Sequence, residues 1–140
     1  MIVNDDAGLR RILENCRVIA MVGLSPKEDR PSHIVARYLM AHGYTVIPVN
    51  PGQREILGQP CYASLREIPV QVDLVDVFRK AEEVPPIAAQ AIAIGARCLW
   101  LQLGIVSEEA ARLASEAGLD VVMDRCTKIE HARLLADHSR

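Results

Sequence analysis

The sequence predicts an α/β protein of the Rossmann-like type, in which a doubly wound, mainly parallel sheet of five to six strands forms the middle of three layers. Short β-branched runs alternate with longer segments whose apolar residues recur at helical spacing. The connections are short, and the run Val18–Val22 is apolar without alternation, as in a strand covered by helices on both faces. We therefore expect one domain over residues 1–140, with a core over about residues 10–135.

Turn and cap residues set the order of the elements. Pro31 suits the first position of a helix because its φ is fixed, and Gly43 is well placed to cap that helix. Ser107 is typical of an N-cap. Pro48 favours an edge position, so we expect a short edge strand near Cys61-Tyr62. The other expected strands are Thr45–Val49, Asp73–Phe78, Arg97–Leu101 and Leu119–Val122, with further helices over residues 5–15, from about Glu82, and over Ile129–Ala136.

The composition excludes several classes of function. Half of the 140 residues are apolar, 24% are charged, and the net charge is −2. A weakly acidic chain offers no general attraction for nucleic acid or an anionic membrane, so we expect neither partner. The N-terminus does not resemble a signal peptide, and no apolar run approaches the roughly 18 residues of a membrane span. The four cysteines are widely spaced, which indicates reduced thiols and a cytoplasmic protein.

The loop after the first expected strand is the most informative candidate binding segment. In doubly wound sheets the ligand lies beyond the carboxyl ends of the strands, where the winding reverses. Gly23 permits close approach of the backbone, and the following helix start offers free N–H groups. Ser25 and Ser32 can donate hydrogen bonds, while Lys27 and Arg30 can neutralise a phosphate. The alternative is a solvated loop in which both cations pair with neighbouring acids, Glu28 and Asp29.

This loop departs from the usual dinucleotide-binding fingerprint. Ser25 and Glu28 stand where that fingerprint requires glycine, and Asn50 stands where it expects an acid for the ribose hydroxyls. A neutral amide, followed by Gln53 and Arg54, suits a ribose that carries an extra phosphate. These residues point away from NAD and leave NADP and coenzyme A (CoA) open.

Five sequence blocks in a fixed order carry a family resemblance. They are Val22–Ser32, Val46–Pro51, Asp73–Arg79, Trp100–Gly104 and Met123–His131. Together they resemble the small stand-alone CoA-binding proteins, whose domain is similar to the nucleotide-binding domain of the succinyl-CoA synthetase α subunit. The resemblance covers roughly residues 10–135 and implies a Rossmann-like fold with CoA as the cofactor.

The resemblance also implies a set of site residues. The CoA pyrophosphate or ribose phosphate would lie on the first loop, at Gly23, Leu24, Ser25, Pro26, Lys27, Arg30 and Ser32. The nucleotide would be bordered by Val49, Asn50 and Pro51, with Phe78 and Arg79 on its adenine side. Gln102 would face the pantetheine arm.

Two departures from the synthetase limit what the resemblance implies. Gln53 follows Pro51-Gly52 where the synthetase carries a lysine, and the Gly-His-Ala-Gly motif of its phosphorylated histidine is absent. We therefore expect the chain to bind CoA or acyl-CoA without catalysis, with an acyl-CoA-using enzyme or a second copy as partner. The alternative enzyme is an NADP-dependent oxidoreductase.

Cys126 and His131 form a second candidate group, near the end of the last strand. A thiol beside Arg125 and Lys128 can have a lowered pKa and exchange disulfides with the CoA thiol, which makes a redox-responsive protein a further alternative. We instead favour a Cys126 that packs under the terminal helix and a His131 that caps the helix or pairs with Glu130. A zinc site lacks further ligands at suitable spacing, so we expect no metal.

Four other polar or aromatic residues are expected to have structural roles. His33 is expected at the surface, and Trp100 in the core. Asp73 and Asp76 lie three residues apart on one strand and face opposite sides, so they cannot form an acid–base pair. One of these two acids is expected to bond a neighbouring loop.

Overall fold

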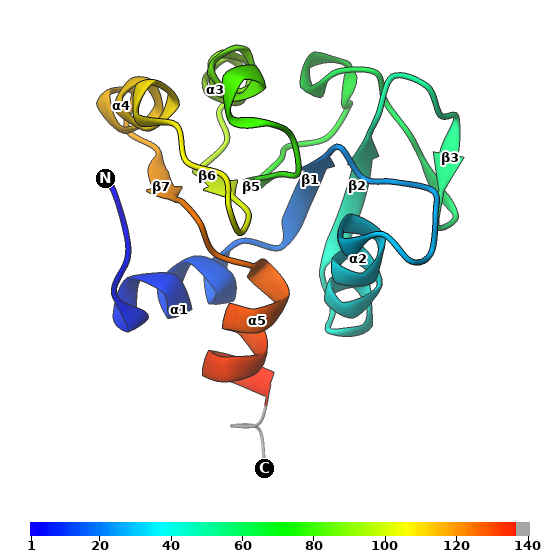
Figure 1. Ribbon diagram of the computed structural model, residues 1–140, viewed down its shortest axis with the longest axis horizontal. Coiled ribbons are helices and arrows are strands. Elements are labelled where there is room, and N and C mark those ends of the chain that lie inside the picture. Colours follow the sequence, from blue (N-terminus) through cyan, green and yellow to red (C-terminus); the bar gives the residue numbers. More distant parts are fainter. Residues whose placement is uncertain (137–140) are drawn as a thin grey trace.

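Five parallel strands form one sheet in the computed structural model, which describes residues 1–136. The sheet order is β2-β1-β5-β6-β7 (Figure 1). The strands are β1 (Val18–Val22), β2 (Thr45–Val49), β5 (Leu74–Val77), β6 (Cys98–Leu101) and β7 (Asp120–Val122). The predicted fold class is confirmed, and the last three strands are slightly shorter than expected.

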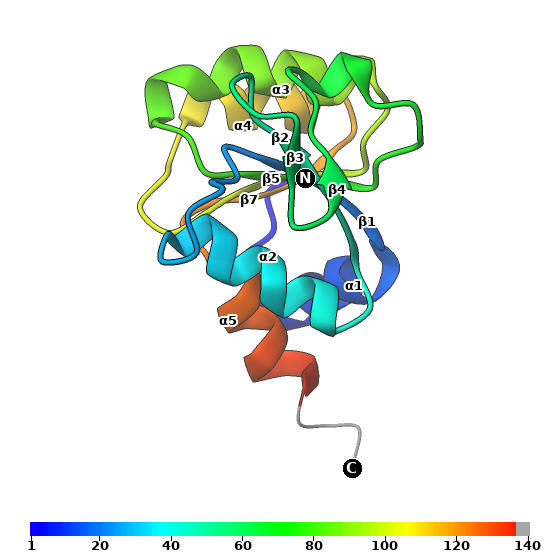
Figure 2. The same ribbon diagram turned by 90° about the vertical axis from the view of Figure 1, so that its right-hand side faces the viewer.

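Helices cover both faces of this sheet. Figures 1 and 2 show α3 and α4 on one face and α1, α2 and α5 on the other. Because both faces are covered, almost every strand residue is buried, which explains the unbroken apolar runs. The helices are α1 (Asp6–Asn15), α2 (Pro31–Ala41), α3 (Val84–Ala93), α4 (Glu108–Glu116) and α5 (Thr127–His131), with a π-helical segment over Ala132–Ala136 and 3₁₀ turns at Leu65–Glu67 and Ala81–Glu83.

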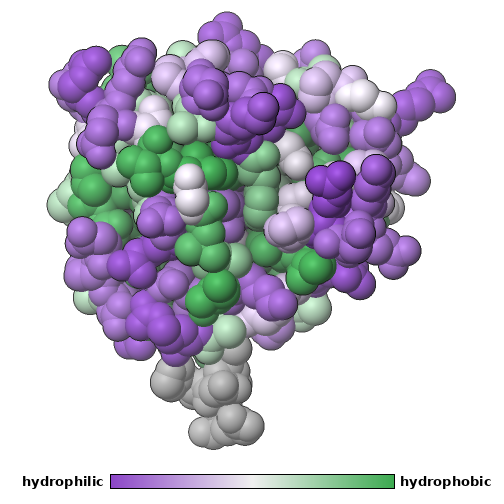
Figure 3. Space-filling model, viewed as in Figure 1, coloured by the Kyte–Doolittle hydropathy of each residue, from purple (hydrophilic) through white to green (hydrophobic). Residues whose placement is uncertain are grey.

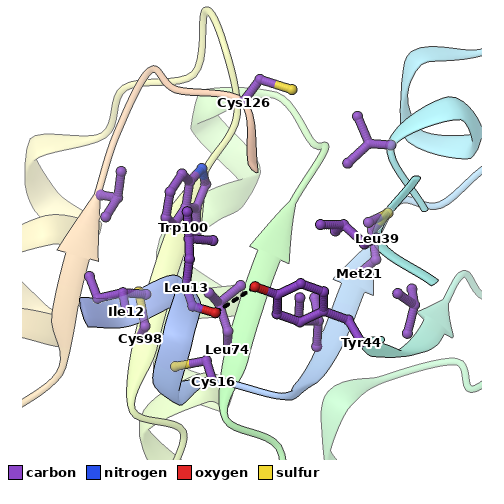
Figure 4. Close-up of a cluster of buried hydrophobic side chains, with 14 of the residues drawn as sticks. Ile12, Leu13, Cys16, Met21, Leu39, Tyr44, Leu74, Cys98, Trp100 and Cys126 are labelled. Carbon is purple, nitrogen blue, oxygen red and sulfur yellow. Dashed lines mark hydrogen bonds between the residues drawn. The ribbon is translucent and has the colours of Figure 1, made fainter. Parts of the chain in front are cut away.

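The core beneath α1, α2 and α5 holds the largest buried side chains. Trp100 is fully buried there, as predicted, and its indole N–H donates to the Arg125 carbonyl at 2.8 Å. The Tyr44 hydroxyl donates to the Leu13 carbonyl (Figure 4). Cys16 and Cys98 pack in the same cluster as free thiols, as expected of small core residues.

Local signals at the helix ends agree with the structure. Pro31 occupies the first turn of α2. The Ser107 side chain accepts a hydrogen bond from the Ala110 N–H and caps α4, as its position predicted. Asp5 caps α1 in the same way through the Gly8 N–H.

The predicted edge strand at Cys61-Tyr62 is reduced to a single bridge residue. The chain instead forms a short antiparallel ribbon from β3 (Glu55–Ile56) and β4 (Gln59–Pro60), and Tyr62 makes a single bridge to Val49. The Tyr62 N–H donates to the Pro48 carbonyl, and the Tyr62 carbonyl accepts from the Asn50 N–H. β2 therefore ends the five-stranded sheet, which is where a proline is tolerated.

The order of the strands fixes where a ligand can lie. β1 pairs with β2 on one side and with β5 on the other, so Val22 is flanked by Val49 and Val77. The connections after β1 and β5 run to opposite faces of the sheet, which leaves a crevice at their carboxyl ends. Within the described part of the chain, no helix has the length and apolar character needed to cross a membrane.

Candidate functional site

Three adjoining hollows lie in this crevice. The apolar cavity, of about 420 Å³, is lined by Pro31, Val35, Phe78, Arg79, Gln102, Leu103, Ile105 and Cys126. The edge hollow, of about 400 Å³, includes Val22, Gly23, Val49, Pro51, Ala63 and Arg79. The loop hollow, of about 200 Å³, is lined by Gly23, Ser25, Arg30, Pro31, Ser32 and Phe78. Gly23, Phe78 and Arg79 each line two hollows, so the three hollows adjoin one another at the point where the winding reverses, and together they are called the groove.

The loop between β1 and α2 is held by its own side chains. The Ser32 hydroxyl accepts from the Ser25 N–H at 3.0 Å, and the Ser25 hydroxyl accepts from the Lys27 N–H at 3.1 Å. In both bonds the hydroxyl acts as the acceptor, so its own hydrogen stays available for a ligand oxygen. These contacts shape a loop whose free donors line the loop hollow.

His33 belongs to this support, and its expected surface position is wrong. The side chain is buried, and a ring nitrogen lies 2.9 Å from the Ser25 carbonyl oxygen. The cause is the start of α2 at Pro31, which turns the next helical positions toward the sheet.

Gly23 is required by the chain itself. Its φ is +90°, and a Cβ there would lie 2.5 Å from the Phe78 carbonyl oxygen and 2.9 Å from Arg79 Cδ. The loops after β1 and β5 therefore meet with no room for a side chain. The close approach predicted for a ligand is made here to the neighbouring loop.

Asn50 ties the loop after β2 to the loop after β1. Its side-chain nitrogen donates to the Leu24 carbonyl at 3.0 Å, and its side-chain oxygen accepts from the Gly52 N–H at 3.2 Å. A carboxylate cannot donate to the Leu24 carbonyl. This bridge gives a structural reason for an amide where dinucleotide-binding folds carry an acid.

The cationic side chains of the groove differ in whether they form ion pairs. Within residues 1–136, neither Lys27 nor Arg30 forms an ion pair, so the predicted alternative pairing with neighbouring acids is wrong. Arg79 instead bonds Glu83 through two nitrogens, and this contact holds the pKa of the Glu83 carboxyl below its usual value. The loop thus presents exposed, unpaired positive charge at one end of the groove.

The apolar cavity occupies the other end. Figure 3 shows apolar residues gathered across the middle of the molecular face that is viewed in Figure 1, and hydrophilic residues flank them. Leu103 is 58% exposed at the cavity, while Val35 and Gln102 are buried. A cavity of this size and lining is typical of sites that bind small organic molecules.

A buried polar network lies beside this cavity. Asp76 is fully buried and accepts from Gln102 Nε2 at 2.6 Å and from the Thr127 hydroxyl at 2.9 Å. Burial raises the pKa of Asp76 to about 7, although both hydrogen bonds act in the opposite direction. Asp73, on the other hand, accepts from the backbone N–H groups of Arg17 and Val18, which confirms that one of the two acids bonds a neighbouring segment.

Cys126 lines the apolar cavity. In Figure 4 it lies at one end of the drawn cluster, and Cys16 and Cys98 lie toward the other end. Burial raises the pKa of its thiol, and the N–H groups of Ile129 and Lys128 only partly oppose this effect. The direction is opposite to the lowered pKa that the redox alternative requires. The structure therefore supports a packed thiol at this position.

His131 does not pair with Glu130, which was one of the two roles predicted for it. Its Nδ1 lies 2.9 Å from the Tyr38 hydroxyl, and burial lowers its pKa. Glu130 bonds Arg133 at 2.6 Å and Arg125 at 3.5 Å. The predicted group around Cys126 and His131 is thus divided between the cavity and the α2–α5 contact.

The structure brings most of the predicted site residues together. The groove is lined by Gly23, Ser25, Arg30, Ser32, Val49, Pro51, Phe78, Arg79 and Gln102. Pro26 and Lys27 lie exposed on the adjacent loop, and Leu24 is buried and contributes only its carbonyl. The sequence reasoning missed Val35, Ile105 and Cys126 as lining residues. No local motif marks them, because the fold assembles them from separate segments.

The five-stranded parallel sheet and the groove at its switch point define a Rossmann-like α/β protein. Within that class, the chain belongs to the CoA binding domain family, whose model matches residues 17–132. This membership agrees with the resemblance carried by the five sequence blocks.

Individual relatives fall into two groups. The chain is 42% identical to the uncharacterized protein YneT of Bacillus subtilis, over 90% of this chain and 93% of that one. A hypothetical protein from Pyrococcus horikoshii OT3 has a similar structure, with a TM-score of 0.93, 44% identity, and 95% and 94% of the two chains covered. The ADP-forming acetate–CoA ligase I of Archaeoglobus fulgidus is 31% identical over 79% of this chain, but the match spans only 18% of the ligase.

Proposed function

We propose that the chain, acting as one domain, binds CoA or acyl-CoA in the groove without catalysis of its own. The observation that carries this proposal is the contrast between the two ends of the groove. One end presents exposed, unpaired cations, and the other is a largely apolar cavity. CoA has matching parts, since a nucleotide rich in phosphates is joined to an uncharged arm. Membership of the CoA binding domain family supports the same ligand.

The proposal gives each hollow a part of the ligand. The phosphates lie at the loop hollow, where Ser25, Ser32 and Arg30 supply donors and Lys27 adds charge. The nucleotide extends along the edge hollow past Val49 and Pro51. The pantetheine arm enters the apolar cavity beside Gln102.

A binding role without turnover is supported by what the chain shares with the ligase. The match covers a small part of that ligase, so we propose that this chain supplies CoA binding only. An acyl-CoA-using enzyme or a second copy of this chain is the proposed partner, and the cytoplasm is the proposed location.

Ligand-dependent unfolding tests this function. A ligand that binds only the folded state raises the melting temperature, by roughly 8 °C when it exceeds its Kd a hundredfold. We expect CoA to give a larger rise than dephospho-CoA, which lacks the ribose phosphate, and a far larger rise than NAD. No rise with millimolar CoA would overturn the proposal, and a larger rise with NADP than with CoA would favour the oxidoreductase alternative.

A further inference from the structure

Gln102 follows β6 and lies against the apolar cavity with only 3% of its surface exposed. Its side-chain nitrogen donates to Asp76 Oδ1 at 2.6 Å and to the Thr127 hydroxyl at 3.0 Å. An amide nitrogen carries two hydrogens, so both are used inside the protein. The polar atom that remains for a ligand is the side-chain oxygen of Gln102.

This oxygen has no hydrogen-bond partner among residues 1–136, although the rest of the side chain is buried. No fully buried side-chain nitrogen or oxygen in that range lacks a partner, so the Gln102 oxygen is not sealed in the core. Gln102 lines the apolar cavity, which is the described hollow that its exposed oxygen can face. The cavity wall thus holds an acceptor that requires a donor.

Asp76 and Thr127 determine which way the amide points. The Thr127 hydroxyl donates its hydrogen to Asp76 Oδ2, so toward Gln102 it can act only as an acceptor. Above its raised pKa, the ionised Asp76 carboxylate is also an acceptor only. If the amide were turned by 180°, its oxygen would face two acceptors, and the network would lose both bonds. The network is therefore consistent with one orientation of Gln102.

The walls of the cavity restrict the chemistry of the donor. Val35, Leu103 and Ile105 are apolar, and Arg79 at the rim is already bonded to Glu83. A charged donor would leave its hydration shell for a single neutral acceptor, which is unfavourable. A hydroxyl donor also has two acceptor lone pairs, and the apolar side chains of the cavity offer no hydrogen-bond donor to them. In a trans amide the N–H and the carbonyl point in opposite directions, so the N–H can meet the Gln102 oxygen while the carbonyl faces away from it.

We propose that the apolar cavity binds an uncharged chain through an amide N–H that donates to the side-chain oxygen of Gln102, and that Asp76 is a positioning residue that keeps this oxygen turned toward the ligand. The inference rests on the proposed function, since the arm of CoA is an uncharged chain with amide groups. It adds a specific acceptor, and a reason for a buried carboxylate that has no cation bonded to it.

Calorimetric titration of variants with two ligands tests the proposal. CoA carries the arm, whereas adenosine 3′,5′-bisphosphate is the nucleotide end without it. Gln102→Met has a similar volume and no acceptor, and we expect it to weaken CoA roughly 3- to 10-fold. The affinity for adenosine 3′,5′-bisphosphate should stay unchanged, because that ligand does not reach the cavity.

The Asp76 variants separate positioning from simple structural support. Asp76→Val removes the acceptor that holds the Gln102 amide, so CoA should weaken by a similar factor while adenosine 3′,5′-bisphosphate binds as before. Asp76→Asn keeps an acceptor oxygen for Gln102, so it should restore most of the CoA affinity. Thermal unfolding of each variant checks that it is folded, and Gln102→Met with Asp76→Asn carries the test if Asp76→Val does not fold.

The possible failures are distinguishable. If the wild-type chain does not bind CoA, the proposed function itself is wrong. If the wild-type chain binds CoA and Gln102→Met binds it equally well, the acceptor is wrong while the proposed function stands. Equal weakening of both ligands by Asp76→Val would show a purely structural role and would overturn the positioning assignment.

Discussion

The two ends of the groove are built in different ways. Apart from Phe78, the loop end is formed by a single stretch of chain, Gly23–Ser32, whose hydroxyls and backbone bond one another and whose cations form no ion pair within residues 1–136. The cavity end is assembled from four separate segments around a buried carboxylate. A local stretch can be recognised from the order of its residues, whereas an assembled cavity depends on long-range contacts. Substitutions at either end, and at the junction where the two ends meet, can break this contrast.

The largest effect is expected at Gly23, where the loops after β1 and β5 touch. Gly23→Ala combines a positive φ with a Cβ 2.5 Å from the Phe78 carbonyl oxygen. Gly43→Ala is a matched control, because its φ is +93° and nothing lies within 4 Å of the added carbon. We expect urea unfolding to show a loss of about 1–2 kcal/mol for Gly43→Ala and at least about 2 kcal/mol more for Gly23→Ala. Equal losses would show that the two loops have room to separate.

Asp76 should make stability depend on pH in an unusual direction. Burial raises its pKa from 3.8 to about 7, so the folded chain holds a proton that the unfolded chain releases between about pH 4 and pH 7. The contribution of this group to the free energy of unfolding is therefore greatest below about pH 4 and falls as the pH rises through that window. Asp76→Asn removes the ionisation and should be more stable than wild type at pH 8, by roughly 2–4 kcal/mol.

The control for this prediction is the same pair of proteins at low pH. At about pH 3, below the unfolded pKa of 3.8, the wild-type carboxyl is largely protonated in both states, so the difference between wild type and Asp76→Asn should largely vanish. Chemical denaturation at several pH values measures both limits. A constant difference across that range would contradict the raised pKa.

The contribution of the loop end to CoA affinity should depend on its positive charge. Arg30→Gln is expected to weaken CoA roughly tenfold at low salt, because a cation that contacts phosphate contributes a charge-assisted hydrogen bond. Arg112→Gln is the matched control, since Arg112 lies on α4 and pairs with Glu116, away from the groove. Titrations at two salt concentrations should show that the loss for Arg30→Gln shrinks as salt rises. Equal affinities of the two variants for CoA would remove the loop from the binding site.

The smallest effect is expected at Cys126. Because burial raises the pKa of its thiol, alkylation by iodoacetamide at pH 7 should be slower than that of free cysteine, and should accelerate at higher pH. Mass spectrometry of digested protein follows the modification of this residue. Rapid alkylation at neutral pH, or a mixed disulfide with CoA that Cys126→Ser abolishes, would revive the redox alternative.

The fold was predictable because its signals are local. The apolar run at Val18–Val22, Pro31 at the start of α2 and the Ser107 cap each determine structure within a few residues. The wrong predictions came where neighbouring segments intervene. Tyr62 makes one bridge beside β2 because the β3–β4 ribbon turns the chain away, and His33 is buried because α2 turns it toward the sheet.

The candidate site shows the same difference between local signals and long-range contacts. The loop residues were identified from their types and their position after the first strand, and most of them line the groove. The role of Asp76 was not identified from the sequence, because its partners Gln102 and Thr127 lie 26 and 51 residues further along the chain. Alternation along a strand showed only that Asp73 and Asp76 face opposite sides. The packing of β5, β6 and the start of α5 supplied the rest.

A crystal structure of the chain grown with CoA tests the central claim most directly. The account predicts phosphate groups at the loop hollow, within hydrogen-bond distance of Ser25 or Arg30, and the uncharged arm in the apolar cavity beside Gln102. Crystals that contain no CoA at millimolar concentration, or an arm that lies outside the apolar cavity, would contradict it.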